Sequence, residues 1–405
     1  MNARDDSVSR RTAAIVFAVG VTCALHVGKL PVAIPVLREA LGLSLVQAGF
    51  LLSLVQLAGM TLGLVVGLTA DRLGPRRVML AGLVLLALGS AFGAVAPGME
   101  VLLLSRVVEG MGFLLAVLPA PGLLRQRVLH APTLSRALGW WGAYMPLGTA
   151  LALLFGSALM GAVGWRWAWA LLALLSLCAA AVLAFCVPAD MRAGGRSPAP
   201  PAAWAPRLKR TLASAGPWWV ALAFFLYSGQ WLAVIGFLPT ICAQAGYGAL
   251  AVGALSALAA GINMTGNIGA GRLLAHGVRP GMLLATGFCA MGLGSVVAFT
   301  AVGYPIAQYL AVLVFSSIGG LIPGTLFGLA VALAPGEDTV STTVGWMQQF
   351  SSLGQFLGPP LVAWVAVQMG GWQFTWLVTG ACSVCGLVLA WRLQTAWHGR
   401  QNAPR

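Results

Sequence analysis

Four ionisable side chains stand out because they lie inside long apolar runs of the sequence. His26 and Lys29 belong to one run, and Arg106 and Glu109 belong to another. An ionisable group in hydrocarbon is costly, so its presence there indicates a functional site. The three-residue spacing within each pair puts both members on one face of a helix. The four residues therefore form a candidate substrate and coupling site with two cations, one carboxylate and a titratable imidazole.

Each of these residues also has a purely structural interpretation. Lys29 follows Arg11 by roughly 27 Å of helix, so its side chain could extend to the outer membrane surface. Arg106 and Glu109 could pair only with each other and brace their helix. In the functional interpretation, an anion bound at Arg106 changes the proton affinity of Glu109. Glu109 is then the strongest candidate for proton coupling, and His26 is a weaker one.

The C-terminal half of the chain offers neutral polar groups instead of charges. Asn263 and Asn267 are four residues apart, so their amides could face one ligand or hydrogen-bond to neighbouring helices. Tyr144 follows Trp140 and Trp141 and is a further candidate for lining a cavity. Positive charge in one half and amides in the other favour a small organic anion as the substrate.

The composition of the chain predicts that lipid surrounds these residues. Of the 405 residues, 59% are hydrophobic and 8% are charged. An apolar run of about 20 residues spans a bilayer as a helix, the form that satisfies its backbone polar groups in hydrocarbon. Twelve such runs lie near residues 12–37, 44–66, 78–97, 101–124, 137–160, 166–187, 217–239, 250–272, 281–303, 305–334, 341–366 and 373–394. The sequence therefore predicts an all-α membrane protein with twelve transmembrane helices.

The basic residues predict the orientation of the chain rather than a nucleic-acid partner. The formal net charge is +14. If the N-terminus is cytoplasmic, most of the arginines fall in cytoplasmic connections, which is the positive-inside bias of membrane proteins. The first apolar run is too long for a signal peptide. We expect a bacterial inner-membrane protein with both termini in the cytoplasm, the lipid bilayer as its surroundings, and no nucleic-acid binding.

The chain divides into two similar halves. Residues 188–216 are rich in Pro, Ala and Arg and separate residues 1–187 from residues 217–405, with six runs in each half. The sequences that begin at Met60 and Met264 share a Met-Thr start and a Gly-Ser end, and "GWRWAW" at Gly164 matches "GWQFTW" at Gly371. We therefore expect two pseudo-symmetric six-helix bundles in parallel orientation. A cytoplasmic linker joins them, and its basic end suits anionic lipid.

The stretch "GLTADRLGPRR" between the second and third runs resembles the signature loop of the major facilitator superfamily. Its principal positions match the pattern G-x-L-a-D-r-x-G-r-[rk] except the third, where Thr69 stands in for Leu, and the residues concerned are Gly67, Asp71, Arg72, Gly74, Arg76 and Arg77. The resemblance implies that Asp71 latches the cytoplasmic gate by accepting hydrogen bonds at the N-terminus of the eleventh helix. The arginines would set orientation or bridge to loop carbonyls or lipid phosphate.

Two further stretches bear on this resemblance. "RVVEGMG", from Arg106, is similar to the R-x-x-Q-G-x-G pattern of the family's fourth helix, with Glu109 in place of Gln. "GAYMPLG", from Gly142, lacks the Gly-Pro pair typical of the family's antiporters. In general layout the chain resembles the branch that carries cyanate and other small anions.

We therefore expect a secondary active transporter that works by alternating access and moves a small organic anion together with protons, as a symporter. A proton-coupled exporter of a drug or metabolite, working by antiport, is the alternative within transport, and a non-transporting sensor or assembly factor is a third possibility. The sequence has no metal-ligand spacing and no catalytic constellation. We expect a monomer that binds a small molecule and protons, needs no cofactor or metal, and is not an enzyme.

Overall fold

A computed structural model describes the backbone of residues 3–128, 130–190 and 204–401. Side chains are described for these residues apart from 3–7, 67–72, 131, 132, 135, 139, 204 and 401. Gly67, Asp71 and Arg72 of the signature loop therefore lie outside the described side chains, although their backbone belongs to a helix.

The described residues form helices joined by short connections, and no strand occurs among them. The N-terminal half contains α1 (Ala3–Leu41), α2 (Leu45–Ser53), α3 (Leu57–Leu73), α4 (Pro75–Ala94), α5 (Met99–Val117), α6 (Ala120–Arg127), α7 (Ala131–Trp141) and α8 (Tyr144–Cys186). The C-terminal half contains α10 (Ala215–Gln244), α11 (Ala249–Gly261), α12 (Asn263–Ala275), α13 (Pro280–Thr300), α14 (Pro305–Gly319), α15 (Leu321–Ala332), α16 (Val340–Gln368) and α17 (Thr375–Gln401). Short 3₁₀ turns at Leu54–Gln56, Glu337–Thr339 and Trp372–Phe374 connect or extend these helices.

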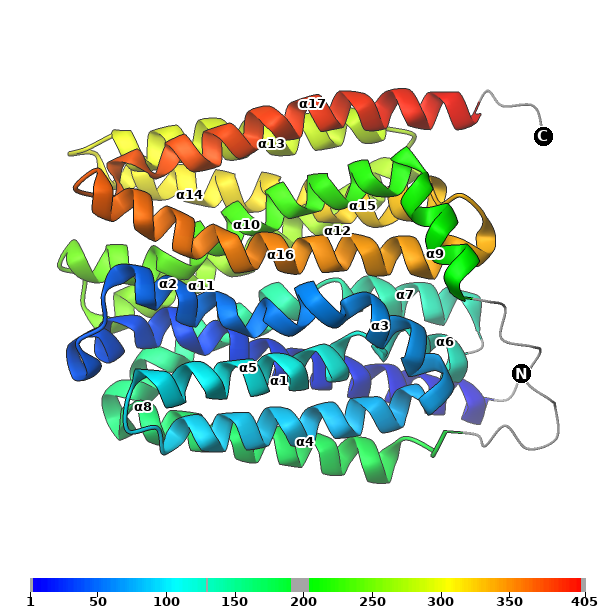
Figure 1. The fold of residues 1–405 in the computed structure, drawn as a ribbon, viewed down its shortest axis with the longest axis horizontal. Coiled ribbons are helices and arrows are strands. Elements are labelled where there is room, and N and C mark those ends of the chain that lie inside the picture. Colours follow the sequence, from blue (N-terminus) through cyan, green and yellow to red (C-terminus); the bar gives the residue numbers. More distant parts are fainter. Residues whose placement is uncertain (1–2, 129, 191–203, 402–405) are drawn as a thin grey trace.

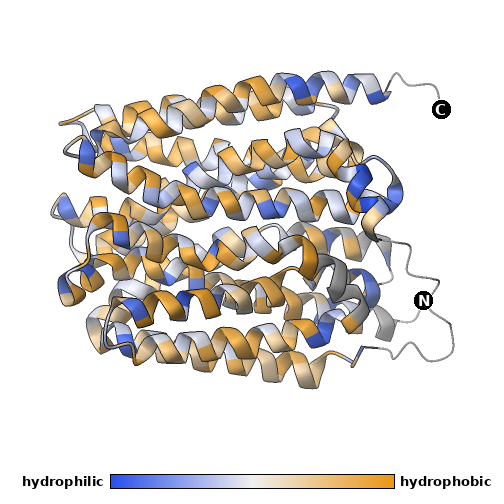
Figure 2. Cartoon of the chain, viewed as in Figure 1, coloured by the Kyte–Doolittle hydropathy of each residue, from blue (hydrophilic) through white to orange (hydrophobic). Residues whose placement is uncertain are grey.

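Eleven helical segments of the described chain are long and apolar enough to cross a membrane. One of them, α8, has 43 residues and is roughly twice the length that a bilayer core requires. Gly164 interrupts it with φ 78° and ψ 161°, a conformation outside the helical region that glycine adopts without a Cβ clash. The prediction of twelve spans is confirmed when α8 is divided at Gly164. Figure 2 shows hydrophobic residues along the lengths of the helices and hydrophilic residues mainly near their ends.

The two halves lie side by side, with α1–α8 on one side and α10–α17 on the other (Figure 1). The helix α1 begins, and α17 ends, at the same end of the molecule, which we call the terminal end. Between the halves, Trp204–Ala213 form an additional helix, α9. This helix lies within the segment 188–216, which the sequence analysis treated as a linker, and α10 already begins at Ala215.

Helix α9 was missed because its stability comes from docking rather than from a long apolar run. Arg210 forms an ion pair with Asp338, and the Arg207 Nε lies 3.6 Å from the same carboxylate. The Trp218 Nε1 donates a hydrogen bond of 2.8 Å to the Leu212 carbonyl. A helix this short is marginal on its own, so these contacts with the C-terminal half stabilise it.

Small residues bring the two halves into close contact. A Cβ on Gly49 would lie 2.9 Å from the Pro360 Cα, and one on Gly253 would lie 3.0 Å from the Leu153 carbonyl oxygen. The Gln56 Nε2 also donates to the Gln355 Oε1 across 3.0 Å. Helix α2 and the 3₁₀ turn Leu54–Gln56 therefore pack on α16, and α8 packs on α11, in the small-residue manner of membrane helices.

Candidate functional site

The four charged or titratable residues that the sequence singled out lie together in one buried cluster. His26 and Lys29 come from α1, and Arg106 and Glu109 come from α5. Lys29 is 2% exposed, and the other three side chains are fully buried. The Lys29 ammonium and the Arg106 guanidinium each form an ion pair with the Glu109 carboxylate, one on each oxygen. The two helices thus place a single carboxylate between two cations.

Lys29 has a complete set of neighbours. Besides Glu109, its Nζ donates a hydrogen bond of 2.9 Å to the Ser90 hydroxyl on α4. It also lies 4.4 Å from the centre of the Trp169 ring on α8, within the range of a cation–π interaction. The Ser90 hydroxyl donates in turn to the Trp169 carbonyl at 2.9 Å. The side chain therefore points into the N-terminal bundle and does not extend to the outer surface.

Arg106 is the less completely paired cation. Its Nη1 donates to Glu109 and, at 3.1 Å, to the His26 carbonyl. Its Nε and Nη2 have no hydrogen-bond partner among the described residues. Two buried nitrogens of a cation, with three N–H groups between them, are thus left without a protein acceptor, which is a costly arrangement.

His26 links the cluster to the last helix of the N-terminal half. Its Nδ1 lies 3.4 Å from the Glu109 carboxylate, and its Nε2 lies 2.8 Å from the Ser176 hydroxyl on α8. A comparable contact occurs in the other half, where the Ser383 hydroxyl on α17 donates to the Gln230 Oε1 on α10 at 3.3 Å. Each half therefore has a polar contact between its first and its last helix, and the titratable partner, His26, belongs to the N-terminal half.

The cluster lies inside the N-terminal bundle rather than between the two halves. Its partners come from α4 and from the part of α8 that follows Gly164. A Cβ on Gly89 of α4 would lie 2.7 Å from the Glu109 backbone nitrogen, so α4 packs directly on this part of α5. In the observed arrangement, the charged side chains are buried among the helices of this bundle.

The two candidate amides of the C-terminal half form a network between helices. The Asn263 Nδ2 donates to the Ser316 carbonyl at 2.8 Å and to the Tyr227 hydroxyl at 3.0 Å. The Asn267 Nδ2 donates to the Asn263 Oδ1 at 2.9 Å. The Trp231 Nε1 donates to the Ser316 hydroxyl at 3.2 Å. Asn263 thus joins α12, α10 and α14, which corresponds to the helix-to-helix interpretation of the sequence.

Tyr144 packs against the preceding helix. Its ring stacks on Trp141, with centroids 4.4 Å apart and planes at 27°. A Cβ on Gly20 of α1 would overlap this pair, at 2.6 Å from Trp141. Trp140 is 64% exposed. Tyr144 and Trp141 therefore pack against α1. Trp140 is the exposed residue of these three aromatic residues.

The described part of the signature loop is held by a residue that the sequence analysis did not identify. Gly74 has φ +92° and precedes α4. The backbone N–H groups of Arg76 and Arg77 donate to the Asp190 carboxylate at 3.2 and 2.9 Å. The Arg76 side chain donates to the Ala184 carbonyl. Asp190 thus acts as the anion at this helix N-terminus, a position for which spacing along the chain gives no signal.

Three other contributors, Ser90, Trp169 and Ser176, were also missed. Ser90 closes one of the two internal echoes, and Trp169 is the last residue of the other. The repeat therefore marked two of these positions without indicating their role. Ser176 had no distinguishing signal, because an isolated serine in an apolar helix is common.

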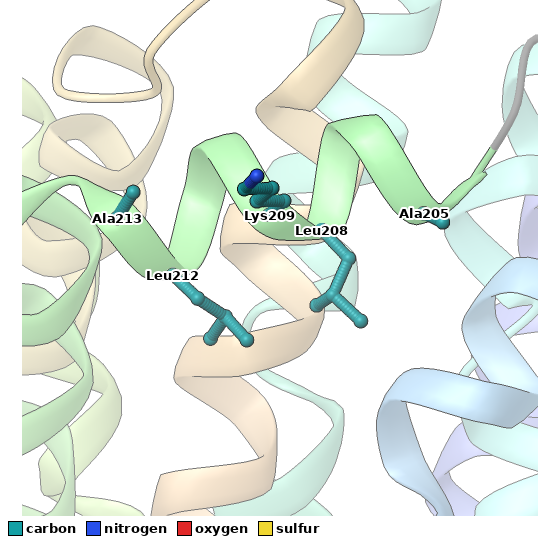
Figure 3. Close-up of a pocket in the computed structure, with 5 residues that line it drawn as sticks. All are labelled: Ala205, Leu208, Lys209, Leu212 and Ala213. Carbon is teal, nitrogen blue, oxygen red and sulfur yellow. The ribbon is translucent and has the colours of Figure 1, made fainter.

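The described structure contains no group of three or more His, Cys, Asp or Glu side chains that could hold a metal ion. A concavity of about 480 Å³ lies along α9 and is lined by Ala205, Leu208, Lys209, Leu212 and Ala213. Figure 3 shows Leu208 and Leu212 on one side of this helix and Lys209 on another. Because all five residues belong to one helix, this feature is a surface depression and not a substrate cavity.

Comparisons with curated proteins identify resistance proteins as relatives. The chain is 32% identical over 131 residues to a multidrug resistance protein B homolog of Mycobacterium tuberculosis. It is 32% identical over 137 residues to a puromycin resistance protein of Streptomyces alboniger, and 28% identical over 153 residues to a methylenomycin A resistance protein of Bacillus subtilis. These regions cover 32%, 34% and 38% of this chain, but only 24%, 27% and 33% of the three relatives.

Solved structures match the fold over its whole length. A bacterial homolog of the human lysosomal transporter Spinster, in an inward-facing and occupied conformation, superposes with a TM-score of 0.80 at 14% identity, and both chains are fully covered. The inward-facing and unoccupied form gives a TM-score of 0.77 at 15% identity, again with full coverage. The sequence profile of the Major Facilitator Superfamily matches residues 13–348. The chain is therefore a member of the major facilitator superfamily, an integral membrane protein with the fold of a transporter.

Proposed function

We propose that the chain is a proton-coupled exporter of an organic compound, working as a monomer in a bacterial inner membrane with both termini in the cytoplasm. The observation that carries this proposal is the buried cluster with one carboxylate. Among the described acidic residues, Glu109 lies in mid-span, whereas Glu39, Glu100, Asp190, Glu337 and Asp338 lie near helix ends or in connections. An ionisable cluster inside a membrane bundle is typical of a proton relay.

The position of the cluster favours an exporter over the small-anion symporter expected from the sequence. Both cations face Glu109 inside the N-terminal bundle, so a compound carried between the halves need not be negatively charged. The resistance functions in the names of the relatives support export. The proposed cycle couples rocking of the two halves to a change of protonation in the cluster.

A small organic anion is the second candidate substrate, because two nitrogens of Arg106, Nε and Nη2, are unpaired. A carboxylate accepts such groups in a bidentate manner. If a rearrangement of α5 opened Arg106 toward the other half, the Nε and Nη2 atoms would be available for this contact. Arg106→Ala would then abolish binding of the anion.

A ligand screen followed by a flux measurement tests these proposals. The purified protein is heated with puromycin, with methylenomycin A and with a panel of carboxylates, because a ligand stabilises the fold by mass action. The stabilising compound is then measured in everted vesicles whose interior is acidified. Gradient-dependent accumulation that is lost in Glu109→Gln supports the exporter, and stabilisation by carboxylates alone supports the second candidate.

Two outcomes of this experiment would reject the proposal. Flux of the stabilising compound that is the same with and without a pH gradient would exclude proton coupling. The signature loop provides the other test, since Asp71→Asn is expected to slow flux in a transporter. A non-transporting member would be identified by two results together. The chain would transport none of the screened compounds, and its biological function would be the same with and without Asp71→Asn.

A further inference from the structure

We propose that Lys29 carries the proton that is exchanged during transport and that it alternates between an ammonium and a neutral amine. This inference rests on the proposed proton coupling and assigns it to one atom, the Lys29 Nζ. The argument uses the charges that face this atom and the directions in which its N–H groups are held.

The first step is the charge balance of the cluster. Helix α1 contributes Lys29 and the imidazole of His26, and α5 contributes Arg106 and Glu109. The groups that face Lys29 from α4 and α8 are Ser90 and Trp169, and Ser176 faces His26, all of them neutral. With His26 neutral, two positive charges and one negative charge leave a surplus of one positive charge. Release of a proton from Lys29 makes the buried cluster neutral.

The second step is the set of contacts around the Lys29 Nζ. An ammonium has three N–H groups. One is directed to Glu109 and one to Ser90, while the remaining neighbour is the face of the Trp169 ring. A neutral amine has two N–H groups and keeps both hydrogen bonds. Deprotonation therefore costs the cation–π contact and the charge attraction to Glu109, but no hydrogen bond, and it removes the repulsion between Lys29 and Arg106.

The other groups of the cluster are less suited to exchange a proton. A guanidinium does not deprotonate in proteins, so Arg106 keeps its charge. Protonation of Glu109 would leave Lys29 and Arg106 as two buried cations without a counter-charge, which is strongly unfavourable. Protonation of His26 would add a third cation beside them. Lys29 is thus the position at which a proton can leave without creating an unpaired buried charge.

The proposed exchange also needs a route to Lys29, which we place along one face of α1. Ala14, Ala18, Val21 and Leu25 are exposed or half-buried and follow one another at spacings of three and four residues along α1. Lys29 is the next position on this face, because it lies four residues beyond Leu25. A rearrangement of about one helical turn would connect the Lys29 Nζ to the terminal end of the molecule, which the proposed orientation places in the cytoplasm.

Nuclear magnetic resonance of lysine labelled at the ε-carbon and ζ-nitrogen tests the assignment directly. The sequence contains two lysines, Lys29 and Lys209, and Lys209 is exposed on α9. Lys209→Arg removes one signal and leaves Lys29 alone in an otherwise unchanged protein. We expect this signal to change between its ammonium and amine values over the pH range in which flux depends on the gradient. A signal that stays at its ammonium value throughout that range would overturn the inference.

A flux measurement separates failure of this inference from failure of proton coupling itself. Lys29→Arg keeps the positive charge but cannot release a proton. We therefore expect this variant still to exchange labelled for unlabelled compound across the membrane. Its accumulation of the compound under a pH gradient should fall to the accumulation measured without a gradient. Lys209→Arg, the matched control, should behave as the wild type. A wild type without gradient-driven flux would reject proton coupling. A driven wild type with an equally driven Lys29→Arg variant would reject only the role of Lys29.

Discussion

Replacing Glu109 with Gln should destabilise the protein more than any other single neutralisation of the cluster. The carboxylate is fully buried and is the counter-charge of both Lys29 and Arg106. Two unit charges about 4 Å apart interact by about 4 kcal/mol at an effective dielectric of 20. Two such interactions are lost, and the relief of carboxylate desolvation offsets part of the loss. Removal of one partner of a buried pair typically costs about 3–5 kcal/mol, and we expect a value in this range.

The assay is reversible unfolding of the purified protein in bicelles, which gives the free energy of unfolding for each variant. Glu100→Gln is the matched control, because Glu100 is an exposed acid in the first turn of the same helix α5. Its loss should cost less than about 1 kcal/mol, the usual size of a charge effect at a helix end.

A second substitution tests whether unpaired charge is the cause. Glu109→Gln leaves two buried cations, whereas the double variant Lys29→Met/Glu109→Gln leaves one, as in the wild-type charge balance. The double variant should therefore be more stable than Glu109→Gln alone, with a coupling energy of about 1–3 kcal/mol. A Glu109→Gln variant within about 1 kcal/mol of the wild type, or a double variant less stable than Glu109→Gln, would refute the electrostatic reasoning.

Three further predictions concern packing and movement. Gly112→Ala should destabilise the protein by about 1–3 kcal/mol in the same unfolding assay, because a Cβ there would overlap the Leu86 backbone nitrogen. Gly161→Ala, inside α8 and with no atom within 4 Å of the added Cβ, should not destabilise it. Asp190→Ala should speed hydrogen exchange at the Arg76 and Arg77 amides, since it removes their acceptor and a helix cap worth about 0.5–2 kcal/mol; unchanged exchange would contradict the capping role. In a chain whose seven native cysteines are replaced, an oxidised Gln56→Cys/Gln355→Cys pair should stop flux and a reductant should restore it, provided that the contact between the 3₁₀ turn Leu54–Gln56 and α16 opens during the cycle; full flux of the cross-linked protein would show that this contact stays closed.

Much of the fold could be predicted from the sequence because transfer into lipid depends mainly on local composition. The apolar runs located the spans, including the two parts of α8. Hydropathy alone does not show the non-helical turn at Gly164 that separates these two parts. Helix α9 could not be located in this way. It has 10 residues, too few to form a membrane-spanning run, and its docking depends on Asp338, more than 100 residues away along the chain.

The candidate site also has features that could be predicted from the sequence and features that depend on the packing of several helices. The sequence identified His26, Lys29, Arg106 and Glu109, because charges in apolar runs are rare and their spacing fixes which of them share a helix face. Whether that face points to lipid, to the other half or into its own bundle depends on the rotation of each helix about its axis. Contacts with Ser90, Trp169 and Ser176 on α4 and α8 fix this rotation, and no pattern along α1 or α5 encodes them.

The sequence by itself thus determined the membrane class, the duplicated architecture, the family resemblance and the residues able to carry charge into the bilayer. Only the tertiary structure decided that two cations share one carboxylate inside the N-terminal bundle, that the amides of the other half join helices, and that Asp190 caps α4 beside the signature loop. The physical reason is that hydropathy and helical periodicity are properties of one segment, whereas the pairing of buried charges is a property of several helices packed together.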